Sequence, residues 1–126
     1  MPSLNRVQLI GRLGKDPETR KLPSGSNVCS FSLAVDRRWK SAQGETREAT
    51  DWFNVDAWGR LGEYCQQYLG KGRLVFVEGR LQIDRVEQGG TVRYFTKVVA
   101  SRMLLVDHKP QEPEPAVEEA ELSIEE

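Results

Sequence analysis

The chain has 126 residues with 38% hydrophobic content, which is enough for one compact core and favours one domain. No apolar run is long enough to span a membrane, and the start lacks a secretory signal pattern, so we expect a cytoplasmic protein. Residues 1–109 hold all 18 Lys and Arg against 12 Asp and Glu, whereas residues 110–126 hold 7 Glu and no base. The resulting body of +6 and tail of −7 suggest a basic surface that meets a polyanion.

Periodic apolar residues predict five β-strands and one helix. In chain order the predicted strands cover residues 7–13, 28–35, 51–60, 74–86 and 92–99, the last running on towards Leu105. Apolar residues between 61 and 68 recur at helical spacing, and a glycine-containing segment at 70–72 ends the helix. The polar segment 36–50 is expected to form a long hairpin excursion with Trp39 near its start.

Three strands, a short helix and a two-stranded hairpin follow the layout of an OB-fold. We therefore predict a mainly β protein, a five-stranded barrel with one short helix between strands 3 and 4. Gly11 and Gly79 lie inside strands, where so small a barrel would bend sharply. The barrel domain is expected to cover residues 1–109, followed by a disordered acidic tail over residues 110–126, which is proline-rich and of one charge sign.

The fourth predicted strand contains a conflict in its alternation. Its apolar residues Val75, Val77, Leu81 and Ile83 are expected to face inward. Strict alternation would then also turn Arg85 inward, which is unfavourable for a charged group. Either a bend at Gly79 or in the hairpin re-aims this side chain, or the assumed register is wrong.

Residues that could support metal binding or catalysis are scarce. Cys29 and Cys65 fall in apolar patterns, where a thiol acts as a small hydrophobe, and His108 is the single histidine. The sequence has no nucleophile–base motif and no glycine-rich phosphate loop. We therefore expect a protein that is not an enzyme and that needs no cofactor and no metal.

The third predicted strand carries two tryptophans on its polar side. Alternation places Phe53 and Val55 on one face and Trp52 and Trp58 on the other, with the polar residues. An exposed indole on a rigid strand, with cations nearby, is suited to stacking nucleic-acid bases. Trp39 in the adjoining hairpin and four basic residues complete this set: Arg37, Arg38, Lys40 and Arg60. The alternative is that the tryptophans close a barrel end or an oligomer interface.

Four motifs, in order, resemble the bacterial single-stranded DNA-binding protein family. They are NRVQLIGRLGKDPETR at 5–20, TDWFNV at 50–55, YLGKG at 68–72 and VEGRL at 77–81. The similarity covers residues 5 to 106. The resemblance implies an OB-fold that assembles as a homotetramer with single-stranded DNA wrapped over it. It also implies a cytoplasmic, nucleoid-associated protein with roles in DNA replication, recombination and repair.

The resemblance also suggests roles for individual residues. Trp39, Trp52 and Trp58 fall where the family places base-stacking aromatics, and Phe53 matches a position at the subunit interface. Together with Arg37, which lies beside Trp39, the residues expected to contact phosphates are Arg6, Lys40, Arg60, Lys71, Arg80 and Arg85.

The sequence departs from the family pattern at two places. A further stacking aromatic of the family aligns with Val86, so one platform is missing there. The family's acidic tail usually ends in a Pro-Phe tip that docks into replication and repair proteins, whereas this sequence ends Leu122-Ser-Ile-Glu-Glu126. Either Leu122 and Ile124 substitute as apolar anchors for such partners, or the tail only competes electrostatically with DNA for the basic surface.

Three other functions are compatible with the same barrel. One is a replication accessory protein that mainly binds other proteins, another is an RNA-binding OB module, and the third is a barrel nuclease. Strong quenching of the indoles by single-stranded DNA would argue against the accessory protein. A preference for a 2′-hydroxyl would identify the RNA-binding module, and turnover of the bound strand would identify the nuclease.

Overall fold

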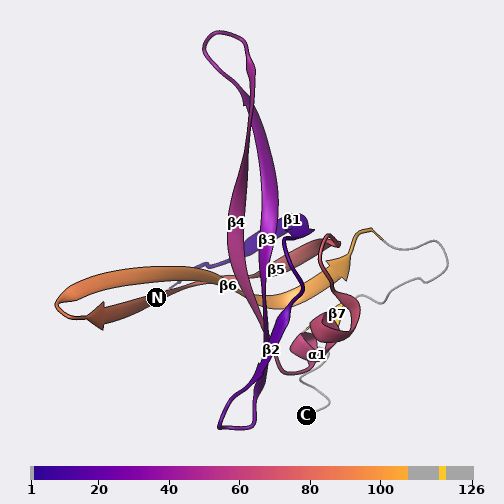
Figure 1. Cartoon of the computed structure of the whole chain (residues 1–126), viewed down its shortest axis with the longest axis vertical. Helices are drawn as coiled ribbons and strands as arrows, with labels where there is room; N and C mark the ends of the chain where they lie inside the picture. Colours follow the sequence, from indigo (N-terminus) through magenta and orange to yellow (C-terminus); the bar gives the residue numbers. More distant parts are fainter. Residues whose placement is uncertain (1, 108–116, 119–126) are drawn as a thin grey trace.

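The computed structural model describes residues 2–107 and 117–118 of the chain (Figure 1). One helix and seven strands are assigned within these residues. They are β1 (Val7–Leu13), β2 (Glu18–Lys21), β3 (Asn27–Lys40), β4 (Thr46–Trp58), α1 (Gly59–Tyr68), β5 (Leu74–Gln88), β6 (Thr91–Leu105) and β7 (Val117–Glu118). Within the described part of the chain, no helix is long and apolar enough to cross a membrane.

Five of these strands close into a barrel. The sheet runs in the order β1-β5-β6-β4-β3, and β1 also pairs with β3 at Arg12↔Ala34 and Leu13↔Leu33. This last pairing joins the two edges of the sheet and completes the ring. The helix α1 lies between the third and fourth barrel strands, so the predicted OB-fold layout is confirmed.

The barrel interior holds many of the apolar side chains that the alternation assigned to it. Its fully buried residues include Leu33 on β3, Val55 on β4 and Val77 on β5, and Leu61 of α1 packs into the same core. Both cysteines are free and fully buried, as predicted for small hydrophobes. The thiol of Cys65 donates a hydrogen bond to Met103 Sδ, with 3.1 Å between the sulfurs.

Gly79 lies where two backbones approach too closely for a side chain. A Cβ at this position would lie 2.1 Å from the carbonyl oxygen of Val99 on β6. The β5–β6 register shifts between Glu78 and Gly79, where Ser101 of β6 has no register partner on β5, and from Arg80 onward no residue of β5 is buried. Gly11 has a similar role on β1, since a Cβ there would lie 2.3 Å from the carbonyl oxygen of Ala34.

Part of the predicted inward face of β5 is wrong. Leu81 is 38% exposed and Ile83 is 64% exposed, because β5 at these positions belongs to a two-stranded arm outside the core. Arg85 is also exposed, and its Nη1 atom lies 3.3 Å from Glu87 Oε2 in an ion pair. The expected conflict at Arg85 therefore does not arise: the register shift adds one residue, Ser101, to β6 and leaves the alternation of β5 unchanged, but the face of β5 that carries Arg85 is exposed beyond Gly79.

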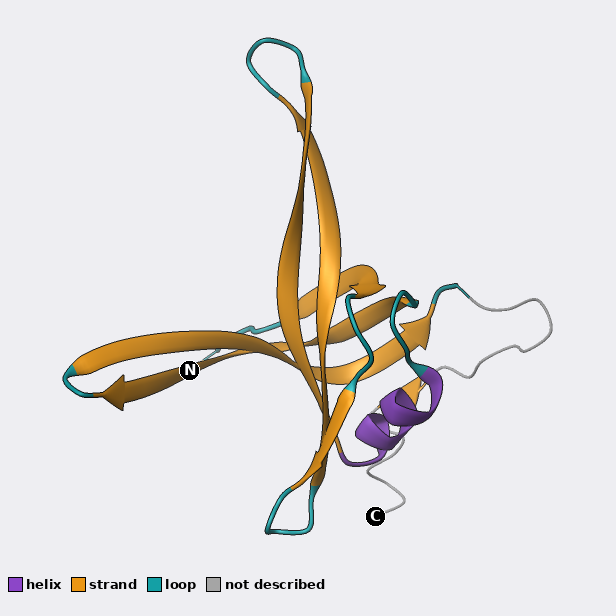
Figure 2. Ribbon diagram, in the orientation of Figure 1, coloured by secondary structure: helices purple, strands orange, loops and turns teal. Residues whose placement is uncertain are grey.

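Two long β-hairpins project from the barrel in different directions (Figures 1 and 2). The first arm is the outer part of β3 and β4, where the ladder continues to Lys40↔Thr46, so the expected hairpin excursion is regular β-structure. The second arm is the outer part of β5 and β6, which pair as far as Gln88↔Thr91. Both arms place side chains far from the core and free to meet a ligand.

Two strands lie outside the predicted set. β2 pairs with β3, and all four of its residues are exposed, so the sequence offers no apolar alternation to reveal it. β7 falls within the predicted disordered tail but pairs with β6 at Met103↔Val117 and Arg102↔Glu118. The rest of the predicted tail, including Leu122 and Ile124, lies outside the described residues, as does His108.

Candidate nucleic-acid interface

Trp52 has the geometry of a stacking platform. It lies on β4 opposite Ala34 of β3, and its side chain is 60% exposed. The indole rests on the backbone of Gly14 in the loop after β1, where an added Cβ would lie 2.5 Å from the ring atom Cζ3. One part of the ring is therefore supported by a glycine, and the remainder is open to a base.

Replacing Gly14 with alanine should displace the Trp52 ring without disturbing the barrel. The backbone of Gly14 does not have positive φ, so alanine is compatible with it, and only the indole must move. We expect a changed Trp emission and weaker binding of single-stranded oligonucleotide, with a melting temperature close to wild type. Gly70→Ala is the matched control, since its Cβ would lie 3.6 Å from the nearest atom, Asp16 Oδ1. Equal affinities of Gly14→Ala and Gly70→Ala for the oligonucleotide would contradict the view that the contact with Gly14 positions the Trp52 ring.

Trp58 shares a face of β4 with Trp52 but is only half-buried rather than freely exposed. Between them, Asp56 is 7% exposed, accepts a 2.7 Å hydrogen bond from Ser30 Oγ and lies 3.1 Å from Lys97 Nζ. Solvent exposure on the polar side of β4 thus decreases towards α1. Ser30 and Lys97 stabilise the buried carboxylate of Asp56. Trp58 offers less open ring surface than Trp52.

Trp39 lies on the other face of the first arm. It pairs with Arg47, and alternation places it with Arg37, whereas Trp52 shares its face with Arg38 and Lys40. The indole is 43% exposed, and the guanidinium carbon of Arg37 lies 4.8 Å from the ring centroid. This cation–π contact fixes the ring on an otherwise thin hairpin. A DNA strand that stacks on both Trp39 and Trp52 must therefore pass from one face of the first arm to the other.

Two of the predicted phosphate-contacting cations come together at the base of the second arm. Arg6 and Arg80 both line a groove of about 550 Å³ that also includes Asn5 and Gly79. Arg6 Nε donates a 2.5 Å hydrogen bond to Glu78 Oε2, and this bond lowers the pKa of Glu78. Arg6 is therefore partly neutralised, while Arg80 is exposed and forms no ion pair within the described residues.

The remaining predicted cations are spread over the first arm, α1 and the loop after α1. Arg37 forms an ion pair with Asp51 at 2.9 Å, Arg60 lies half-buried in the first turn of α1, and Lys40 is exposed near the tip of the first arm. Lys71 is exposed in the loop after α1, where its backbone N–H donates a 2.8 Å hydrogen bond to Asp16 Oδ1. Because Asp16 follows Gly14 in the same loop, Lys71 and Trp52 belong to one end of the molecule.

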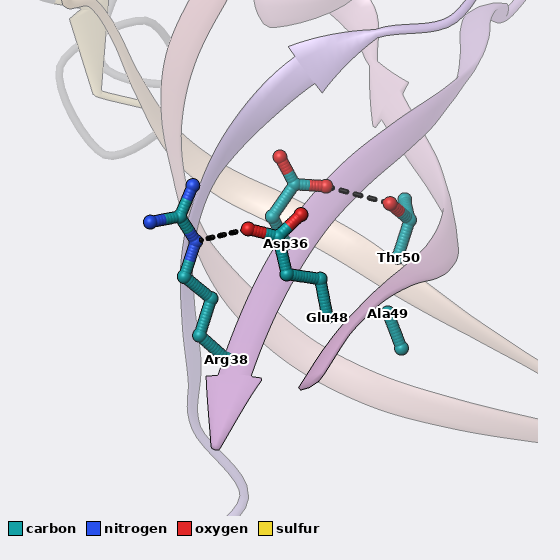
Figure 3. Close-up of a pocket in the computed structure, with 5 residues that line it drawn as sticks. All are labelled: Asp36, Arg38, Glu48, Ala49 and Thr50. Carbon is teal, nitrogen blue, oxygen red and sulfur yellow. Dashed lines mark hydrogen bonds and ion pairs between the residues drawn. The ribbon is translucent and has the colours of Figure 1, made fainter. Parts of the chain in front are cut away.

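A shallow pocket on the first arm does not resemble a catalytic site. It measures about 450 Å³ and is lined by Asp36, Arg38, Glu48, Ala49 and Thr50 (Figure 3). Arg38 Nε lies 2.8 Å from Glu48 Oε1, and Thr50 Oγ1 donates a 2.7 Å hydrogen bond to Asp36 Oδ1. Its polar groups are thus satisfied by one another. In the part of the chain that the structure describes, no group of three His, Cys, Asp or Glu could hold a metal ion.

The second arm exposes two aromatic residues that are not among the predicted binding residues. Phe95 is 53% exposed and Tyr94 is 65% exposed, although the segment 92–99 has the composition of a barrel strand. The sequence contains one signal of this exposure, the adjacency of Tyr94 and Phe95. Neighbouring residues on a strand face opposite sides, so these two rings cannot both enter one core.

Comparisons with known proteins agree with this architecture. The model of the Single-strand binding protein family matches residues 4–106. "Single-stranded DNA-binding protein 1" of Chlorobaculum tepidum is 43% identical over 108 residues, covering 84% of this chain and 67% of that protein. The "Single-stranded DNA-binding protein" of Neisseria meningitidis serogroup A is 45% identical over 106 residues, covering 82% of this chain and 60% of that protein. The matched region therefore spans about two thirds or less of these relatives' length.

Two solved structures have the same fold. A Plasmodium falciparum SSB in complex with ssDNA has a TM-score of 0.80 and 29% identity, with 85% of this chain and 98% of that chain covered. A deletion mutant of the single-stranded DNA-binding protein from Thermus aquaticus has a TM-score of 0.75 and 33% identity, with 82% and 51% covered. Taken with the matched family model and the curated relatives, these likenesses lead to one conclusion: the chain belongs to the single-strand binding protein family.

Proposed function

We propose that this chain binds single-stranded DNA without regard to sequence and does not catalyse a reaction. The observation that carries the proposal is Trp52, an indole 60% exposed, seated on Gly14 and held by a barrel strand. Each base stacked on such a ring contributes about 1–3 kcal/mol, and any base can stack. The relatives named as single-stranded DNA-binding proteins, and the neighbour solved with ssDNA, support the same ligand.

In this proposal the basic side chains neutralise phosphates while the tryptophans stack bases. Arg80, Lys40 and Lys71 are the strongest candidates, because they are exposed and have no ion pair within the described residues. Arg6, Arg37 and Arg85 must share their charge with Glu78, Asp51 and Glu87. Arg60 lies close to Trp58 in sequence and completes the set.

A fluorescence titration at two salt concentrations tests this function. Oligo(dT) should quench the Trp emission, and the affinity should fall with salt, because phosphate contacts release counterions. Competition by the matched RNA strand reports whether a 2′-hydroxyl is preferred. Recovery of intact oligonucleotide after incubation is expected from a binding protein. Absence of quenching at low salt, or cleavage of the strand, would contradict the proposal.

We also propose that the chain works as a homotetramer. β1 pairs with β5 from Val7 to Arg12 but with β3 only at Arg12 and Leu13, so its N-terminal part has an unpaired edge within the described residues. Ile10 near this edge is 54% exposed, and Phe53 on β4 is only half-buried against the core. Open edges and exposed apolar groups favour self-association. A solution mass equal to the monomer would overturn this point.

The proposed processes are DNA replication, recombination and repair, with the acidic tail as a modulator. Residues 110–126 carry 7 Glu and no base, so they can compete with DNA for the basic body. Leu122 and Ile124 are the candidate anchors for replication and repair proteins. Removal of residues 110–126 should tighten oligo(dT) binding at low salt, and an unchanged affinity there would exclude the competition.

A further inference from the structure

The second arm has two faces of different character. Beyond the bulge at Gly79, residue pairs opposite one another share a face, and they include Asp84↔Phe95 and Val86↔Arg93. Phe95 therefore lies on the same face as Asp84, Val86, Arg93 and Lys97. The opposite face carries Leu81, Ile83, Arg85 and Tyr94.

Lys97 connects the first of these faces to the tryptophan face of β4. Its Nζ atom lies 3.6 Å from Asp84 Oδ2 on the arm and 3.1 Å from Asp56 Oδ2 on β4. A hydrogen bond from Gln82, and the charge of Lys97, lower the pKa of Asp84, so this carboxylate stays ionised and keeps the bridge. Asp56 shares its side of β4 with Trp52 and Trp58. The Phe95 face of the arm is thus continuous with the face that presents the tryptophans.

Phe95 has the three features that a base-stacking residue needs. Its side chain is 53% exposed, so a ring face is available. It is held by a regular antiparallel ladder that extends from Arg80↔Val99 to Gln88↔Thr91. Arg93, two residues away on the same face, is exposed and forms no ion pair within the described residues, so it can meet the adjoining phosphate.

We propose that Phe95 is a base-stacking residue for single-stranded DNA and extends the bound strand from the tryptophan face of β4 onto the second arm. This inference rests on the proposed function, and it gives the arm an aromatic platform at a position other than Val86. The path would run from Trp52 past Lys97 to Phe95. A phenyl ring has a smaller π-face than an indole, so Phe95 should contribute less than Trp52.

The test is oligo(dT) titration of Phe95→Ala in the full chain, followed by the intrinsic Trp emission. We expect an affinity about 5- to 50-fold lower than wild type, a value within the range for one lost stack. The slope of log affinity against log salt should not change, because no phosphate contact is removed. Phe95→Trp should keep the affinity at or above that of wild type and add Trp emission that the bound DNA quenches.

Two controls separate the possible outcomes. Tyr94→Ala removes a more exposed aromatic from the opposite face, and its affinity should stay within about twofold of wild type. Melting temperature and solution mass should be unchanged in both variants. If wild type binds but Phe95→Ala binds equally well, or if Tyr94→Ala loses as much, the inference about Phe95 fails alone. If wild type does not bind, the proposed function fails. A reduced mass for Phe95→Ala would assign this residue to a subunit contact and overturn the inference.

Discussion

Trp52→Ala is expected to weaken oligo(dT) binding by about 5- to 150-fold, because it removes one complete indole–base stack. The effect on folding should be small, since the side chain is 60% exposed and contributes little to the core. Titration against oligo(dT), with circular dichroism and solution mass measured in parallel, checks both expectations. Fluorescence quenching should also lose the contribution of this indole.

Trp52→Phe provides the matched comparison, since it keeps an aromatic ring over Gly14 and should recover part of the affinity. The interpretation of Trp52 as a stacking residue predicts the order wild type, then phenylalanine, then alanine. An unchanged affinity with a smaller oligomer would instead assign Trp52 to a subunit contact.

Gly79→Ala should have the largest effect on stability. A Cβ would lie 2.1 Å from the carbonyl oxygen of Val99, and the nearest atoms are backbone that cannot move without opening the β5–β6 ladder. Overpacking of this kind costs about 1–3 kcal/mol or more in free energy of unfolding. Thermal unfolding should show a melting temperature lower by roughly 5–20 °C.

Gly70→Ala is again the control, because its Cβ would make only an ordinary contact at 3.6 Å with Asp16 Oδ1. A wild-type melting temperature for Gly79→Ala would mean that the bulge tolerates a side chain. In that case the departure of the second arm from the barrel would need another explanation than close backbone approach.

The barrel could be predicted from the sequence because its signals are local and strong. Alternating apolar residues such as Leu33, Val55 and Val77 mark strands whose inner face is buried along the ring. The position of α1 between the third and fourth barrel strands then limits the topology to very few arrangements. The face on which Trp52 lies could also be predicted, since it follows from the alternation of β4, whereas the degree of exposure could not, because Asp56 on the same face is 7% exposed.

The outer parts of the molecule could not be predicted in the same way. Leu81 and Ile83 continue the alternation of β5, but burial depends on a second layer that ends at Gly79. The alternation of apolar residues along a strand does not indicate where the layer that covers this strand ends. β2 has four exposed residues and depends on its ladder with β3, which is a non-local pairing. The contact of Trp52 with Gly14 likewise joins distant segments, and the periodicity of the sequence does not predict it.

Under the proposed function, the two arms separate the binding of DNA from the folding of the barrel. Their ladders are not covered by a second apolar layer, so their hydrogen bonds should open locally, at a lower free energy than unfolding of the barrel. Native-state hydrogen exchange should therefore be faster near Lys40 and Gln88 than at Val55 and Val77. Because little of the core depends on the arms, substitutions there can retune affinity at small cost in stability. Under the proposed function, the DNA-binding surface on the arms can thus change in evolution while the barrel sequence stays under its own separate constraint.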